Sequence, residues 1–182
     1  MTDRPSPRPS PNPNSPRGAP LLDRFTMGGA ILAYAVSDLT IEQEQARPGP
    51  GAWSIAELVV HLLDTDLVYS DRMKRVIAED DPVLQNMDET AWAARLGYQE
   101  SSVAEAVSLL AGNRRWMSKI LRRLNDADFA RSGRHTERGR LTLAELVATV
   151  TNHLDHHLRF VLYPSVLRAA SAASRLSPWS SI

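Results

Sequence analysis

The 182-residue sequence predicts an all-α protein, a four-helix bundle with a long crossover between its second and third helices. Two observations lead to this fold class. Apolar residues recur at spacings of three and four along four long segments, which is the period of an amphipathic helix. No segment shows the alternation of apolar and polar residues that marks a half-buried strand. With 43% apolar and 23% charged residues, the chain can form one domain with a sizeable core.

The first two helices are delimited by local signals. The first is predicted over Leu21–Gln45 and ends before Arg47–Gly51, where proline and glycine break the helical pattern. The second starts at a capping box, in which Ser54 and Glu57 satisfy each other's free backbone amides. Its apolar pattern predicts that it continues to about Glu79.

The last two helices begin with the same kind of signal. Ser102 and Glu105 form a capping box for a third helix that reaches about Leu124. A further box at Thr142 starts a fourth helix, which is predicted to run at least to Tyr163.

The connection and the two ends differ in composition from the helices. The segment Asp80–Ser101 is longer than an antiparallel hairpin needs, so it is predicted to carry a short helix over Asp88–Arg95 and to let the third helix cross the bundle end. Residues 1–20 hold seven of the 12 prolines and almost no apolar side chains, which predicts a disordered tail. The bundle then spans residues 21–168, and the serine-rich residues 169–182 are predicted to be a flexible tail.

Composition excludes several classes of function. The chain has no cysteine, which excludes disulfides, thiolate nucleophiles and cysteine metal sites. Its 21 basic and 21 acidic residues give no net field for a polyanion, so no nucleic-acid partner is expected. No run of 18 apolar residues and no signal peptide is present, so we expect a cytoplasmic protein without a membrane partner.

Histidine is the residue type that points to chemistry. The chain has five: His61, His135, His153, His156 and His157. At about 100° per residue, His153 and His157 lie on one flank of the fourth helix's apolar stripe, while His156 lies farther toward solvent. This four-residue spacing lets one helix offer two ligands to a metal.

A third ligand is available on the second helix. His61 lies on a flank of that helix, and two helices meeting along their flanks would bring three imidazoles together. Three neutral ring nitrogens plus water make an open metal site. In the alternative, the histidines of the fourth helix are surface residues and His61 is a hydrogen-bonded, partly buried one.

Two segments resemble those of a known family. Trp53–Asp64 resembles the WSxxExxxHLxD signature of DinB-like (damage-inducible) proteins. His135–Leu146, followed by the sequence HLDHH, resembles the loop and last helix of the same superfamily, and the resemblance covers about Leu21–Leu167. It implies a four-helix bundle, often dimeric, so a homodimer is an expected assembly.

The resemblance also implies a metal and a class of reaction. In that superfamily the histidine of the first motif and two of an HxxxH motif bind a divalent metal, and they correspond to His61, His153 and His157. The function implied is a metal-dependent hydrolase or a thiol-dependent S-transferase that acts on a small molecule. A non-catalytic metal or small-molecule binding protein of a stress response is the alternative. Zinc is the default metal and nickel its close rival. Any thiol would be an external, low-molecular-weight one.

Three further residues are candidates for the site or its support. Helical phase places Asp66 and Arg114 in the centres of two apolar stripes, and a lone buried charge is costly, so we predict that they form an ion pair. Alternatively, Asp66 turns toward His61 and orients it, or both charges reach water. Asp66 stands where the family signature often has a glutamate. The aspartate side chain is shorter, so its carboxylate reaches less far from the helix. His135, in a predicted polar loop, is either a substrate contact or acid–base group at the site mouth, or a solvated residue.

Overall fold

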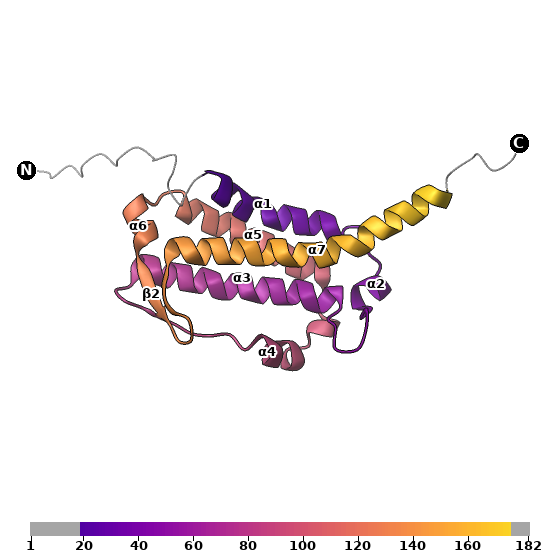
Figure 1. Ribbon diagram of the computed structural model, residues 1–182, viewed down its shortest axis with the longest axis horizontal. Coiled ribbons are helices and arrows are strands. Elements are labelled where there is room, and N and C mark those ends of the chain that lie inside the picture. Colours follow the sequence, from indigo (N-terminus) through magenta and orange to yellow (C-terminus); the bar gives the residue numbers. More distant parts are fainter. Residues whose placement is uncertain (1–18, 176–182) are drawn as a thin grey trace, which may run out of the picture.

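Four long helices form an elongated bundle (Figure 1). The computed structural model describes residues 19–175, with side chains described as far as residue 162. Of the two predicted tails, residues 1–18 and 176–182 lie outside the described residues, whereas residues 169–175, which were predicted to be flexible, are helical. Within these residues no helix is both long and apolar enough to span a membrane. The bundle helices are α1 (Ala19–Val36), α3 (Ile55–Ala78), α5 (Val103–Leu121) and α7 (Leu143–Arg175).

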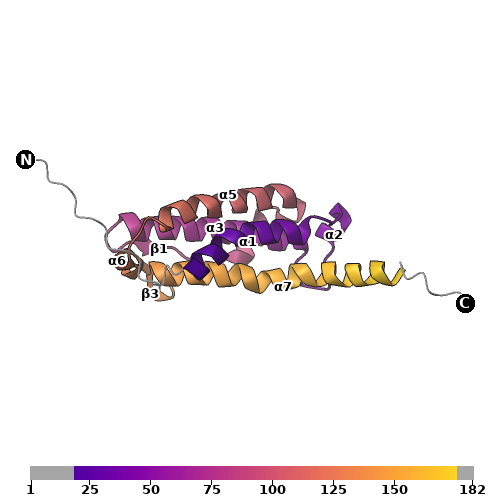
Figure 2. The ribbon, with the colours of Figure 1, turned by 90° about the horizontal axis from the view of Figure 1, so that it is seen from above.

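The bundle has the crossover that the sequence predicted. Helix α1 packs against α5 and α7, and α3 packs against the same two helices, so α1 and α3 occupy a diagonal (Figure 2). The Ser54 hydroxyl, at the start of α3, donates to the Gln99 side chain at 2.9 Å, just before α5 begins. Helix α5 therefore starts beside the start of α3 and runs parallel to it. This arrangement requires a connection that returns along α3.

That connection contains the predicted short helix. It consists of β1 (Val83–Leu84), α4 (Glu89–Arg95) and the 3-10 turn η1 (Tyr98–Glu100). The Asp88 side chain caps α4 by accepting a hydrogen bond from the Ala91 amide at 2.9 Å. Figure 1 shows α4 alongside α3, on the outside of the bundle.

The prediction of one continuous helix over Leu21–Gln45 is wrong. Helix α1 ends at Val36, and a separate short helix, α2, covers Ile41–Gln45. Thr40 caps α2, since its hydroxyl accepts from the Gln43 amide at 3.4 Å and the Gln43 side chain accepts from the Thr40 amide at 3.1 Å. This reciprocal cap starts a new helix at a position where the apolar pattern alone indicated continuity.

The structure also contains a small sheet that the sequence did not indicate. Strand β2 (Ser132–His135) pairs with β1 in parallel and with β3 (Gly139–Thr142) in antiparallel register. A short helix, α6 (Asp126–Ala130), precedes the sheet. Strands of two to four residues are too short to show an alternating pattern, and they are held by backbone pairing. The hairpin leads directly into α7, which continues through Pro164 to Arg175.

A polar layer divides the apolar core into two clusters. At its centre, the Asp66 carboxylate accepts from Arg114 Nε at 2.8 Å and lies 2.7 Å from Nη2, and each residue is 1% exposed. The same guanidinium donates to the carbonyls of Phe25 and Val150, at 3.2 and 3.1 Å. A Cβ at Gly28 would overlap Arg114 Nη1, so any side chain there would displace the guanidinium from these bonds. One arginine of α5 thus links α1, α3 and α7.

Candidate metal centre

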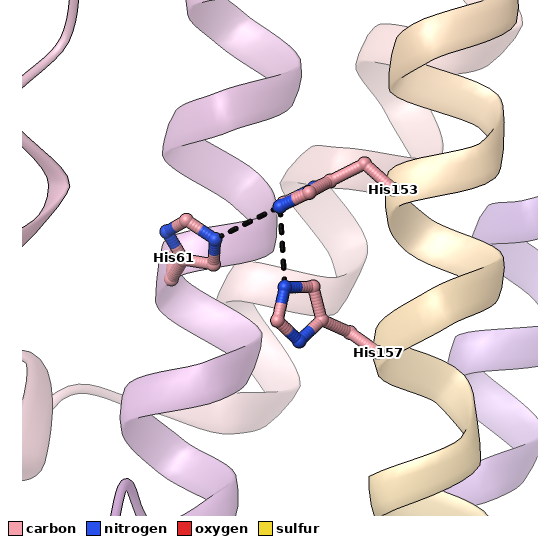
Figure 3. Close-up of side chains that lie close together, drawn as sticks. All are labelled: His61, His153 and His157. Atoms are coloured by element: carbon pink, nitrogen blue, oxygen red, sulfur yellow. Dashed lines mark hydrogen bonds between the residues drawn. The ribbon is translucent and has the colours of Figure 1, made fainter.

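Three imidazoles converge between α3 and α7 (Figure 3). His61 comes from α3, and His153 and His157 come from successive turns of α7. The Nε2 atom of His153 lies 3.1 Å from that of His61 and 3.2 Å from that of His157. All three ligand atoms lie within 4.8 Å of one another. We call these residues the three-histidine cluster.

The spacing of the cluster fits a single small cation. Ligation at about 2.1 Å places two nitrogens roughly 3.0 Å apart at a right angle and about 3.4 Å apart in a tetrahedron. The two short nitrogen–nitrogen distances, 3.1 and 3.2 Å, fall in that interval. The donor set also suits a divalent transition metal, because it consists of imidazole nitrogens alone.

The electrostatics of the cluster favour neutral imidazoles. Burial, with a contribution from His157, lowers the pKa of His61 to about 4. Burial and the neighbouring histidines lower the pKa of His153 to about 3. Burial and His156 lower the pKa of His157 as well. All three rings are therefore neutral near pH 7, which is the form that can bind a metal.

In two of these rings, the second ring nitrogen has no hydrogen-bond partner among the described residues. Among the described residues, the Nδ1 atoms of His61 and His157 are buried and have no hydrogen-bond partner. The Trp53 ring packs edge-on against His61, with 5.0 Å between ring centroids. The rings are thus positioned by packing and not by a carboxylate.

Glu89 is a site residue that the sequence analysis missed. It lies in the first turn of α4, and its Oε2 is 3.9 Å from His61 Nε2. Its side chain is half exposed, so it can exchange protons with solvent. The Asp88 cap predicts the local helix, but only the path of the crossover along α3 brings Glu89 to the cluster.

The other histidine of α7 and Asp66 do not add a ligand atom to the cluster. His156 is exposed, and its ring contacts those of His157 and Phe160. Asp66 does not orient His61; its second oxygen accepts from the Asn113 side chain at 3.0 Å, on the Arg114 side of α3. Asp66 therefore forms the predicted ion pair with Arg114. The alternative, in which Asp66 turns toward His61 and orients it, is wrong.

His135 is neither a solvated loop residue nor part of the cluster. It ends strand β2 and is only 5% exposed. Its Nδ1 accepts hydrogen bonds from the backbone amides of Glu137 and Arg138, at 3.2 and 3.3 Å. Burial, together with Arg72 and Arg138, lowers its pKa. Its ring stabilises the turn of the hairpin and lines a small cavity that also contains Glu89.

Comparison with known proteins identifies the family. Residues 24–161 match the model of the DinB superfamily. The chain belongs to this superfamily. The match includes all three residues of the cluster and both segments whose sequence resembled DinB-like proteins.

Several proteins of similar sequence carry names that refer to a metal. A protein of Oceanobacillus iheyensis named "Putative metal-dependent hydrolase" is 29% identical over 131 residues, which cover 72% of this chain and 76% of that protein. One of the same name from Geobacillus kaustophilus is 31% identical over 128 residues, covering 69% of this chain and 71% of that one. The solved structure of YfiT from Bacillus subtilis has a TM-score of 0.79 at 23% identity, covering 90% of this chain and 93% of YfiT. YfiT is described as having an unusual four-helix bundle topology, and the similarity of the two structures shows that this chain has the same fold.

Proposed function

We propose that this DinB-superfamily protein is a metal-dependent hydrolase in which His61, His153 and His157 hold one divalent metal ion. The observation that carries the proposal is the convergence of three neutral imidazole nitrogens, from one buried and two partly buried rings, with distances of 3.1 and 3.2 Å. The names of its relatives support the same reaction class.

The chemistry follows from the charges of the site. A divalent ion on three neutral ligands acts as a Lewis acid that polarises a substrate oxygen and lowers the pKa of water. The three imidazoles add no negative charge that would weaken this effect. Among the described side chains, Glu89 is the carboxylate that lies within 4.0 Å of a ring nitrogen of the cluster, with its Oε2 3.9 Å from His61 Nε2. At this distance it can accept a proton from a group bound at the cluster. We assign to Glu89 the role of general base and proton carrier to solvent.

The metal is proposed to be Zn²⁺, with Ni²⁺ as the alternative. Sites with three histidines and an open coordination position are typical of catalytic zinc. Imidazole also binds nickel well, so the ligands alone do not separate the two. Metal analysis of the protein purified without a histidine tag is expected to give about one ion per chain.

A thiol-dependent S-transferase is the second candidate. A metal that lowers the pKa of water also deprotonates a bound thiol, and the chain has no cysteine of its own to supply one. A cavity of about 890 Å³ beside His157 has room for a thiol together with a second substrate. In this case turnover would require an added low-molecular-weight thiol, whereas a hydrolase needs only water.

The experiment compares metal-loaded protein with two glutamate variants on panels of esters, amides and electrophiles, with and without thiol. Glu89→Gln is expected to lower kcat by about 100-fold or more without loss of metal. Glu79→Gln, at the exposed far end of α3, is the matched control and is expected to match the wild type. Full metal occupancy with no turnover on any panel would contradict both enzymatic proposals and favour a binding protein.

A further inference from the structure

A large cavity opens beside the three-histidine cluster, toward α2 (Figure 1 shows α2 next to the start of α3). Its volume is about 890 Å³, which is sufficient for a medium-sized organic ligand. The segment between α2 and α3, the first turn of α3 and one face of α7 form its walls. His157 belongs both to this wall and to the cluster, so the cavity adjoins the proposed metal position.

The wall of the cavity is mainly apolar. Trp53, Ile55, Leu58 and Phe160 are among the residues that line it. Leu58 precedes His61 on α3 by less than one turn, a rise of about 4.5 Å. A ligand that fills the cavity can therefore place one end at the cluster. A strongly polar ligand would lose hydrogen bonds to water against this wall without replacing them.

The charge at the cavity is positive. Arg47 also lines it, but its guanidinium pairs with the buried Glu57 carboxylate. Arg159 is exposed at the cavity and has no acidic partner in the part of the chain that the structure describes. Within residues 19–162, no aspartate or glutamate lines the cavity. Glu89 lies in a separate small cavity with His135.

We propose that this cavity binds the apolar part of an amphiphilic, anionic substrate. The hydrolysable bond lies at the three-histidine cluster, the alkyl or aryl group lies against Trp53 and Phe160, and the negative group lies near Arg159. This inference rests on the proposed function, because it assigns the substrate class of that same site. We favour a small molecule over a protein segment because the cavity is lined both by His157, a residue of the proposed metal site, and by Arg159, which has no acidic partner among the described residues.

The test uses three probes with the same eight-carbon chain and different head groups: octanoate, octan-1-ol and octylamine. Each is titrated calorimetrically into the full-length protein with EDTA present, so that the cavity is measured apart from any metal. We expect octanoate to bind about threefold more tightly than octan-1-ol, and octylamine to bind most weakly. The cavity can bind a probe even if the cluster holds no metal, so failure of the proposed function would be visible separately, in the metal analysis.

Two variants and their matched controls locate the binding. Arg159→Gln is expected to remove the preference for octanoate while leaving octan-1-ol unaffected, and Phe160→Ala is expected to weaken all three probes about fivefold. The controls lie on α5, away from the cavity: Arg115→Gln replaces an exposed arginine, and Trp116→Ala replaces an aromatic residue as exposed as Phe160. Neither is expected to change the affinity for any probe.

Other results would overturn the inference. Equal affinity for the three head groups would contradict the anionic assignment. If no probe binds and Phe160→Ala instead converts a dimer to monomers in light scattering, the cavity is a contact between two copies of the chain. If truncation after residue 175 is needed before any probe binds, the end of the chain occupies the cavity.

Discussion

Removal of the buried ion pair between Asp66 and Arg114 tests the central packing of the fold. Asp66→Ala and Arg114→Ala are each expected to lower the free energy of unfolding by about 3 to 5 kcal/mol, because each leaves a charge buried without its partner. Both residues are 1% exposed, so water cannot replace the lost contact. Arg115→Ala, at the exposed neighbouring position, is the control and is expected to change stability by less than about 0.5 kcal/mol.

The structure predicts that the two single variants respond differently to pH. Burial raises the pKa of the Asp66 carboxyl, while Arg114 and Asn113 act in the opposite direction. In Arg114→Ala the carboxyl loses its main stabilising partner, so its pKa rises further and it can be neutralised by a proton. A folded-state pKa above the unfolded value adds stability at low pH that is lost as the pH rises, so the deficit relative to wild type grows as the pH rises above the ordinary range of an aspartate. Asp66→Ala leaves an arginine, which stays charged, so position 66 of this variant adds no pH dependence of its own to the stability.

Urea denaturation at several pH values measures both effects. The double variant removes both charges and is expected to cost at least about 2 kcal/mol less than the sum of the two single variants. Additive losses, or an Arg114→Ala deficit that does not change with pH, would refute the reasoning.

Three other predictions concern the cluster and its neighbourhood. Replacing any one residue of the three-histidine cluster by alanine is expected to remove most of the metal, whereas His156→Ala is expected to retain it; equal retention in metal analysis would contradict the ligand assignment. In metal-free protein, the cluster pKa values of about 4 and 3 lie below the ordinary 6.5, so stability is full above pH 6.5 and falls as the pH drops toward 4; denaturation curves independent of pH would contradict this. Thr65 is 4% exposed and, among the described residues, its hydroxyl has no partner, whereas that of Thr151 donates to the Val147 carbonyl at 2.7 Å. Thr65→Val is therefore expected to be neutral or stabilising and Thr151→Val to cost about 1 kcal/mol, and the opposite order in thermal unfolding would show that Thr65 has a hydrogen-bond partner.

The sequence by itself determined the features that depend on short-range interactions. The box at Ser54 and Glu57 forms with bonds of 2.8 and 3.2 Å, and an equivalent box at Thr142 precedes α7. The same helical geometry places His153 and His157 on one face, because the angle between residues four apart is fixed wherever a helix forms. The meeting of Asp66 and Arg114 was also predictable, since helical phase places both inside and burial requires that their charges be paired.

Only the tertiary structure decided which distant segments meet. Strand β1 pairs with residues about fifty positions later in the sequence, and this pairing helps to bury His135. Glu89 reaches the cluster because the crossover returns along α3, a path that no local pattern encodes. The cavity beside His157 likewise depends on how α2, α3 and α7 diverge. Helix caps and helical phase are set by neighbours within four residues, whereas these contacts depend on packing the whole chain into one core.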